Sequence, residues 1–338
     1  MAKKPARVSR ASVPGMLGGV AGGGGQGEST AALLAAFAAN VGIAIAKFVG
    51  FLITGSSSLL AESIHSVADA GNQGLLALGG RRARKPPSPL HPFGYGRSRY
   101  FYAFVVAMVL FTLGGLFAIY EGWHKISDPH EVTSPAVAFS ILGVAIILEA
   151  FALRTAMKHA RGPKGERGWI RYIRTSRSPE LPVLLLEDAA ALCGLILATA
   201  GIAASVLTGN PVWDGVGTLS IGVLLVLVAI VLALEMQSLL LGEAADPATL
   251  ARIEAALAEA PNVRRLIHIL TQHIGPEELL VAAKLEFAPE LTVAELAASI
   301  DEAERRIREA LPFAARVYLE PALLLSGDEV DTPLAVER

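Results

Sequence analysis

Five ionisable or amide side chains stand at helical spacing in the stretch LLAESIHSVADAGNQ, which lies in the middle of a long apolar run. At about 100° per residue, His65 and Asp69 lie about 40° apart on a helix, and Glu62 lies about 20° from Asp69. Asn72 and Gln73 continue the same line one turn further on. These residues therefore form a polar stripe on one helical face. An imidazole and a carboxylate one turn apart are suitable ligands for a divalent cation such as Zn²⁺.

Acidic residues in two later apolar segments lie at a similar depth to this stripe. With a rise of about 1.5 Å per residue, Asp188 and Glu149 fall near the level of Asp69. An ionised side chain in hydrocarbon costs about 2.5–3.5 kcal/mol on insertion scales, so such groups are rarely retained without a role. We interpret His65, Asp69 and Asp188 as ligands of a cation that could be Zn²⁺, Co²⁺, Mn²⁺ or Fe²⁺. The alternative is a structural polar cluster that joins helices by hydrogen bonds.

The elements that must position these residues are long apolar segments. The chain is 53% hydrophobic and only 18% charged, whereas about a quarter of the residues of a soluble domain are charged. A net charge of −2 argues against a nucleic-acid partner, and the single cysteine, Cys193, cannot form an intramolecular disulfide. A helix needs about 20 apolar residues to cross a bilayer. Six segments meet this requirement: 30–54, 57–80, 100–121, 134–157, 181–207 and 212–236.

The charges of the connecting loops predict the orientation of these six spans. The loop 81–99 has six Lys/Arg residues and the loop 158–180 has seven, whereas the loop 122–133 has only Lys125. By the positive-inside rule, both basic loops and both termini are cytoplasmic. Six spans with both ends on one side are consistent with this orientation.

The composition divides the chain into four parts. Residues 1–28 carry four Lys/Arg and a glycine-rich run, which is typical of a disordered tail. Residues 29–241 form the transmembrane domain. Residues 242–323 have the α-β-β-α-β order of a small α+β, ferredoxin-like domain, whose amphipathic helix directs Val293, Leu296 and Ile300 inward. Its core is marginal in size, so pairing with a second copy is plausible. Residues 324–338 form a C-terminal tail.

Two further charges face each other across the first hairpin. Only TGSSS joins the first two spans, so they form an antiparallel pair in which Lys47 and Glu62 lie at similar depth. Because two separate buried charges are costly, we predict that these side chains form an ion pair.

The H-x-x-x-D pair within SLLAESIHSVAD, the HPFGYGR stretch after it, the six spans and the C-terminal α-β-β-α-β domain together resemble the cation diffusion facilitator family. The resemblance covers about residues 30 to 323. It implies a homodimeric transporter that exports Zn²⁺ or a similar ion from the cytoplasm in exchange for protons. In this family the second and fifth spans each supply two ligands. His65 and Asp69 match the first pair, and Asp188 matches the second member of the other.

One family ligand has no counterpart here. The position one turn before Asp188 is Leu184, where the family has His or Asp. The adjacent Glu187 lies about 100° round the helix from Asp188. Glu149 lies near Asp69 in depth, and it falls where family members often carry an Asn that faces the site. We therefore expect Glu149 to be the fourth ligand, with Glu187 as its rival.

Two secondary metal sites of the family are also altered. In the basic loop the family's H-x-x-x-H appears as His91 with Tyr95, and the usual preceding acid is Ser88. In the last strand the usual His is Tyr318, although Glu320 remains.

Together these features predict a proton-coupled divalent metal antiporter that exports Zn²⁺ across the cell (plasma or inner) membrane. It is expected to work as a homodimer in the lipid bilayer, without enzymatic activity or a prosthetic group. An exporter of Mn²⁺, Fe²⁺ or Co²⁺ is one alternative. Another is a non-transporting membrane scaffold whose soluble domain recruits a partner. An intramembrane metalloprotease is disfavoured because the H-E-x-x-H spacing is absent from the sequence.

Overall fold

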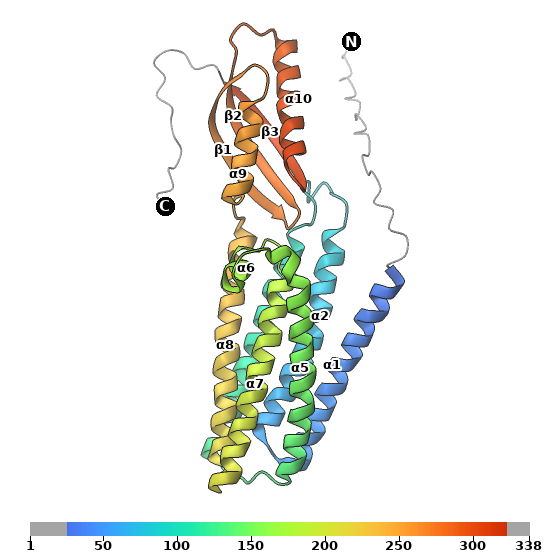
Figure 1. The fold of residues 1–338 in the computed structure, drawn as a ribbon, viewed down its shortest axis with the longest axis vertical. Helices are drawn as coiled ribbons and strands as arrows, with labels where there is room; N and C mark the ends of the chain where they lie inside the picture. Colours follow the sequence, from blue (N-terminus) through green and yellow to red (C-terminus); the bar gives the residue numbers. More distant parts are fainter. Residues whose placement is uncertain (1–25, 323–338) are drawn as a thin grey trace, which may run out of the picture. The chain divides into compact units, whose positions relative to one another are not determined.

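The computed structural model of the chain describes residues 26–322. The predicted C-terminal tail lies outside them, as does the N-terminal tail up to residue 25; the first helix begins at Gln26. Residues up to Ala39 form one unit, of which the structure describes the beginning of α1, and everything discussed below belongs to the second unit, from Asn40 onward. The helices of the first part of the chain (Figure 1) are α1 (Gln26–Thr54), α2 (Ser57–Ala83), α3 (Ser98–Val109), the π-helix η1 (Leu110–Leu116), α4 (Phe117–Ser127), α5 (Pro135–Lys164), α6 (Trp169–Thr175), α7 (Glu180–Thr208) and α8 (Val212–Leu241).

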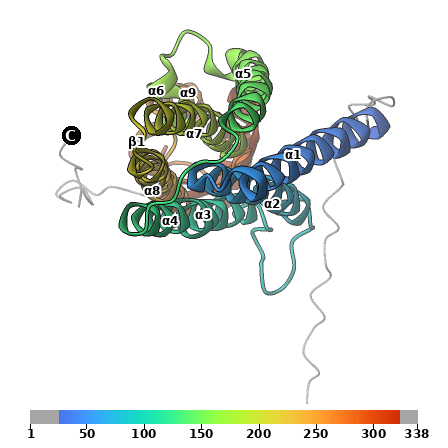
Figure 2. The same cartoon turned by 90° about the horizontal axis from the view of Figure 1, so that it is seen from below.

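The helical domain is a bundle in which α8 packs against α3, η1, α4 and α7, as the end-on view of Figure 2 shows for α4 and α7. One apolar core, which includes Leu59 of α2, Leu142 of α5 and Leu225 of α8, joins the helices of the bundle. Among the residues that the structure describes, four helical stretches could each cross a membrane by length and composition: Ser98–Ser127, Pro135–Lys164, Glu180–Thr208 and Val212–Leu241. The stretch α2 is not among them because its polar stripe and its terminal arginines lower its mean hydropathy. The count of six spans therefore stays a prediction.

The third predicted span is not a regular α-helix. Between α3 and α4 the π-helix η1 contains Gly114 and Gly115, and an added Cβ at Gly114 would lie 3.7 Å from Nδ1 of His65. Further along, a Cβ at Gly122 would lie only 2.5 Å from the backbone nitrogen of Leu219. Glycine therefore allows α4 and α8 to touch through their backbones. Single π-helical turns occur frequently at functional sites.

The soluble domain contains α9 (Pro247–Ala258), β1 (Val263–Gly275), β2 (Glu278–Phe287), α10 (Val293–Ala310) and β3 (Ala314–Ala322), so the predicted α-β-β-α-β order is confirmed. The sheet order is β1-β2-β3, antiparallel between β1 and β2 and parallel between β2 and β3. Alternate residues of β2 are buried, as period-two patterning requires. The inward placement of Val293 is wrong: its side chain is 85% exposed. As the first residue of α10, next to the capping pair Thr292 and Glu295, it precedes the turns that pack on the sheet.

Candidate functional site

The polar stripe of α2 faces the interior of the bundle. Glu62 and Asn72 are fully buried, His65 is 1% exposed, and Val67 on the opposite face is 55% exposed. The helix begins at a short turn in which Gly55 adopts a positive φ of 67° and Ser56 caps the first turn through its side chain. The short hairpin thus places the stripe against the other helices, where isolated polar atoms need partners.

His65 and Asp69 are brought together, but they are not saturated with partners. Nε2 of His65 lies 3.5 Å from Oδ2 of Asp69, which is longer than an ordinary N–H···O hydrogen bond. Both ring nitrogens of His65 and Oδ1 of Asp69 are buried without a hydrogen-bond partner among the described residues. Because a buried unsatisfied polar atom costs about 1–3 kcal/mol, this arrangement is suited to receiving a ligand.

Asp188 in α7 and Glu149 in α5 complete an acidic cluster around Asp69. The carboxylate of Asp188 is an electrostatic neighbour of those of Glu149 and Asp69, and Glu149 also interacts with Asp69. The four predicted ligands do not form a coordination group in this conformation. Over residues 26–322, no three His, Cys, Asp or Glu side chains lie close enough together to hold an ion. The bundle therefore gathers the charges around Asp69 without closing a coordination sphere.

The turn of α7 that carries Asp188 also directs Glu187 at the stripe. Glu187 is 3% exposed, and its Oε1 accepts a hydrogen bond of 2.7 Å from Nδ2 of Asn72. Leu184, at the position of the absent family ligand, packs instead against a small apolar cluster that includes Ala156 of α5 and Tyr172 of α6. Sequence reasoning gave Glu187 only its angle from Asp188 and missed its contact with Asn72. The available signal was the amide of Asn72 on the stripe, which needs a hydrogen-bond partner when it is buried.

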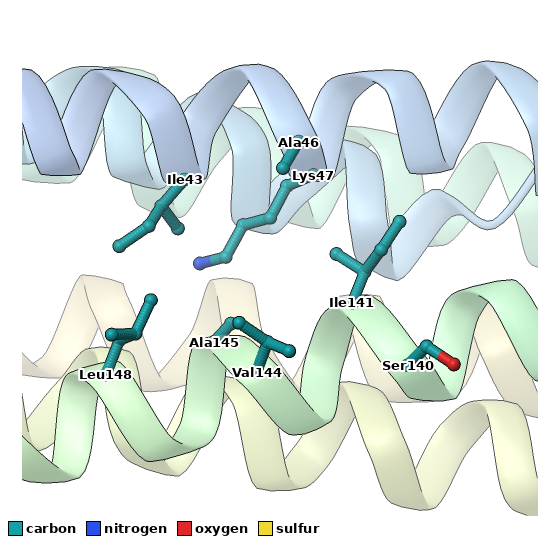
Figure 3. A pocket seen from close by; sticks show the side chains of 8 residues that line it. All are labelled: Ile43, Ala46, Lys47, Ser140, Ile141, Val144, Ala145 and Leu148. Atoms are coloured by element: carbon teal, nitrogen blue, oxygen red, sulfur yellow. The ribbon is translucent and has the colours of Figure 1, made fainter.

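The predicted pair of Lys47 and Glu62 is confirmed. Nζ of Lys47 lies 2.9 Å from Oε2 of Glu62 and donates a second bond of 2.9 Å to Oγ of Ser66. Lys47 also lines an apolar cavity of about 320 Å³ between α1 and α5, together with Ile43 and Val144. Figure 3 shows the side chains of these residues and of Lys47, which extends from α1. Both charged side chains are fully buried, so each depends on the other for neutralisation.

A glycine of α7 leaves room for this ion pair. An added Cβ at Gly194 would lie 2.5 Å from Oε1 of Glu62, so alanine there forces a shift of the carboxylate that Lys47 holds. We expect Gly194→Ala to lower the free energy of unfolding by about 1–3 kcal/mol, measured by thermal unfolding in detergent. Gly143→Ala in α5 is the control, since an added Cβ there meets nothing within 4 Å and should stabilise the helix by up to about 1 kcal/mol. Equal unfolding temperatures for Gly194→Ala and wild type would contradict this packing.

A second buried charge cluster fastens the start of α2 to α8. Asp214 is fully buried; its Oδ1 accepts a 2.9 Å bond from Oγ of Ser56, and its Oδ2 accepts a 2.9 Å bond from the backbone N–H of Ser57. Lys125 lies 3.9 Å from Asp214 and donates to the carbonyl of Gly55 at 3.0 Å. Lys125 is thus a buried residue of α4, and its interpretation as a loop residue is wrong. Sequence reasoning missed Asp214. The run of three serines at residues 56–58 was the available signal, because it indicates that this end of α2 contacts a polar group.

Two family models match the chain. The model of the cation efflux transmembrane domain matches residues 33–241, and that of the cation efflux protein cytoplasmic domain matches residues 245–321. The chain belongs to the cation efflux, or cation diffusion facilitator, family. The predicted resemblance is therefore confirmed, and with it a multi-pass membrane protein of a family of transporters. A helical transmembrane domain precedes a soluble α+β domain.

Curated relatives of this cation efflux protein come from several kingdoms. The human mitochondrial proton-coupled zinc antiporter SLC30A9 is 32% identical over 243 residues, which cover 71% of this chain and 43% of that protein. Metal tolerance protein C4 of Arabidopsis thaliana is 30% identical over 249 residues, which cover 73% of this chain and 54% of that protein. The chain thus spans about half the length of these two relatives. Magnetosome protein MamB of Paramagnetospirillum magneticum is 24% identical over 290 residues, which cover 85% of this chain and 92% of that protein.

The altered loop motif of this cation efflux protein is braced internally. The hydroxyls of Ser88 and Tyr95 lie 3.1 Å apart, and the rings of His91 and Tyr95 are in contact, with centroids 4.5 Å apart and planes tilted by 32°. Where the family pattern would place an acid and a second His, this loop has a hydrogen bond and an aromatic contact.

Proposed function

We propose that this cation efflux protein exchanges a divalent metal cation for protons, with Zn²⁺ as the best-suited ion. The observation that carries the proposal is the close approach of His65 and Asp69, which have buried atoms without partners and lie within electrostatic reach of two further carboxylates. The ligands would be His65, Asp69, Asp188 and Glu149. Because they do not form a coordination group in this conformation, binding requires their side chains or helices to move together around the ion.

The chemistry of these ligands explains why metal and protons would compete. Metal binding requires a neutral imidazole and ionised carboxylates, so protonation of His65 or Asp69 weakens it. Without a cation, ionised carboxylates at Asp69, Glu149 and Asp188 repel one another in a medium of low dielectric constant. Either a divalent ion or protons relieve this repulsion. A site that holds one or the other, and opens to either side in turn, exchanges them.

The donor set favours particular ions. One imidazole with carboxylates suits tetrahedral Zn²⁺, whereas a carboxylate-rich site also admits Mn²⁺, Fe²⁺ or Co²⁺. The relatives that are named zinc antiporter or zinc transporter, as in Pectobacterium atrosepticum, support Zn²⁺. The ion is cargo here, and no prosthetic group or enzymatic step is needed.

The same proposal includes a membrane topology and a dimer. The basic loops 81–99 and 158–180 support six spans in the cell membrane with both termini cytoplasmic. The soluble domain is small, and two copies would bury more apolar surface than one. We therefore infer a homodimer that is held together at least in part by this domain.

Transport in sealed proteoliposomes tests the function. With an acidic interior, vesicles that contain the protein should accumulate Zn²⁺ from outside, and collapse of the pH gradient by an ionophore should stop accumulation against the concentration gradient. A panel of Zn²⁺, Mn²⁺, Fe²⁺ and Co²⁺ ranks the ions. Accumulation that is equally fast without a pH gradient or membrane potential contradicts antiport. No uptake of any ion, by protein that is folded and inserted, favours the scaffold alternative.

The fourth ligand is tested by two matched substitutions. Because Oε1 of Glu187 is already held by Asn72, we expect Glu149→Gln to weaken Zn²⁺ binding by at least about tenfold, equivalent to about 1.4 kcal/mol. Glu187→Gln should weaken it less. Isothermal titration calorimetry with both variants measures this difference. A larger loss for Glu187→Gln would show that α7 supplies the fourth ligand.

A further inference from the structure

A second cavity lies beside the ends of α2 and α8 and the start of α3. It measures about 650 Å³ and is lined by residues from the end of α2, the start of α3, the end of α8, the connecting segment before α3, and strands β1 and β2. Arg82, Arg97 and Gln272 are among its polar residues, and Phe101, Tyr102 and Leu240 are among its apolar ones. It is separate from the acidic cluster around Asp69.

The positive charge of this cavity is not neutralised. Within residues 40–322, the guanidinium groups of Arg82 and Arg97 make no ion pair within 4.0 Å and donate no hydrogen bond. The neighbouring Arg99 differs, because its Nη2 donates a 2.8 Å bond to Glu180. The nearby Arg316 lies over the ring of Phe93 at 5.8 Å. Two arginines that line one cavity favour an anion, and planar guanidinium groups are well matched to phosphate.

The apolar side of the cavity indicates where this phosphate comes from. Phe101 and Tyr102 lie near the start of the stretch Ser98–Ser127, and Leu240 lies near the end of α8; both stretches are long and apolar enough to span a membrane. Aromatic residues near the end of a span lie at the level of the lipid headgroups. Phe101 is 53% exposed and can contact acyl chains below a headgroup. A free phosphate ion would use none of this apolar surface.

The walls of the cavity are held in place before any ligand arrives. An added Cβ at Gly96 would lie 2.8 Å from the carbonyl oxygen of Ile274 and 3.0 Å from Cα of Gly275, so the backbone before α3 packs directly on β1. Tyr102 is packed over Gly79 of α2, where a Cβ would lie 2.9 Å from Cβ of Tyr102. Pre-organised walls reduce the entropic cost of binding.

We propose that this cavity binds the headgroup of an anionic phospholipid, with its phosphate on Arg82 and Arg97 and its acyl chains against Phe101. Basic pockets between membrane helices bind acidic headgroups in this way. The proposal does not depend on metal transport. It gives a lipid contact to the segment before α3, in which the family's metal-binding motif is altered at Ser88 and Tyr95.

Lipid binding to the full-length protein in detergent tests the proposal. Native mass spectrometry and thermal unfolding are followed while phosphatidylglycerol, phosphatidylcholine or glycerol phosphate is added. We expect Arg82→Gln/Arg97→Gln to weaken phosphatidylglycerol binding at least about tenfold, as expected from lost charged hydrogen bonds. Arg81→Gln/Arg84→Gln removes the same charge from the same stretch but outside the cavity, and should change binding by less than about twofold.

Each other result overturns the proposal. Equal losses in the two double variants mean that the basic segment attracts lipid by its overall charge alone. Unchanged binding in Arg82→Gln/Arg97→Gln means that the lipid lies elsewhere. Equal stabilisation of wild type by phosphatidylcholine removes the role of the anionic headgroup, and equal stabilisation by glycerol phosphate assigns the cavity to a soluble phosphate compound. Both double variants must first unfold at the wild-type temperature in the absence of lipid. If only Arg82→Gln/Arg97→Gln fails this check, Arg82→Lys/Arg97→Lys replaces it. This variant keeps the charge and should still lose about tenfold in affinity, because lysine lacks the planar guanidinium group.

Discussion

Asp69→Ala, His65→Ala and Asp188→Ala should each reduce metal transport by more than about a hundredfold, while the protein stays folded and inserted in the membrane. The expectation follows from the unpartnered atoms of His65 and Asp69 and from the carboxylate of Asp188, which interacts electrostatically with Asp69. Loss even of a group that only supports a ligand costs about 10–100-fold in metal affinity, and loss of a ligand itself costs more. Initial rates of Zn²⁺ uptake into proteoliposomes measure the effect.

An acidic residue outside the site provides the matched control. Asp128 is exposed after the end of α4, so Asp128→Ala makes the same chemical change without touching the cluster and should transport at the wild-type rate. Full transport by Asp69→Ala, His65→Ala or Asp188→Ala would remove that residue from the site. Metal binding to the wild type should also weaken as the pH falls, because protons occupy the same ligands. Affinity that does not change with pH would argue against shared ligands.

Lys47→Met and Glu62→Gln should each destabilise the protein by about 3–5 kcal/mol, because each leaves one buried charge without its partner. The two groups lie 2.9 Å apart and are both fully buried. The double variant removes both charges and should be more stable than either single variant. Thermal unfolding in detergent without metal measures all four proteins of this double-mutant cycle.

Two results bear on the interpretation of this cycle. If the destabilisation of the double variant equals the sum of the two single effects, Lys47 and Glu62 are not coupled energetically. Apolar packing would then stabilise the contact between α1 and α2. The variant Ser66→Ala separates the ion pair from its hydrogen bond, since Ser66 accepts from Lys47 at 2.9 Å. It should cost about 1 kcal/mol, well below the effect of removing either charge.

Short-range features could be predicted from the sequence with good accuracy. The inward stripe of α2 follows from the 3.6-residue period, and the alternating burial of β2 follows from the period of two. The pair of Lys47 and Glu62 could be predicted because a short turn fixes how two helices face each other. Val293 was placed wrongly because the period alone does not say where the packed face of a helix begins.

Contacts between helices far apart in the sequence could not be predicted in this way. The angle between Glu187 and Asp188 is known from the sequence, but the rotation of α7 against α2 is not, and it places Glu187 on Asn72. The same limitation hid the bond between Asp214 and the serines at the start of α2. The π-helical turn beside His65 also depends on packing against other helices, because helical periodicity does not distinguish it from an α-helix.

The amino-acid sequence alone was enough to establish the family, the apolar segments, the stripe with His65 and Asp69, and the order of elements in the soluble domain. These features depend on composition, on local periodicity and on short connections. Only the tertiary structure showed that Glu187 contacts Asn72 on the stripe, how Asp214 and Lys125 are buried, and that Arg82 and Arg97 line one cavity. Each of these depends on the depth and rotation of one helix relative to another, which apolar packing over the whole bundle sets.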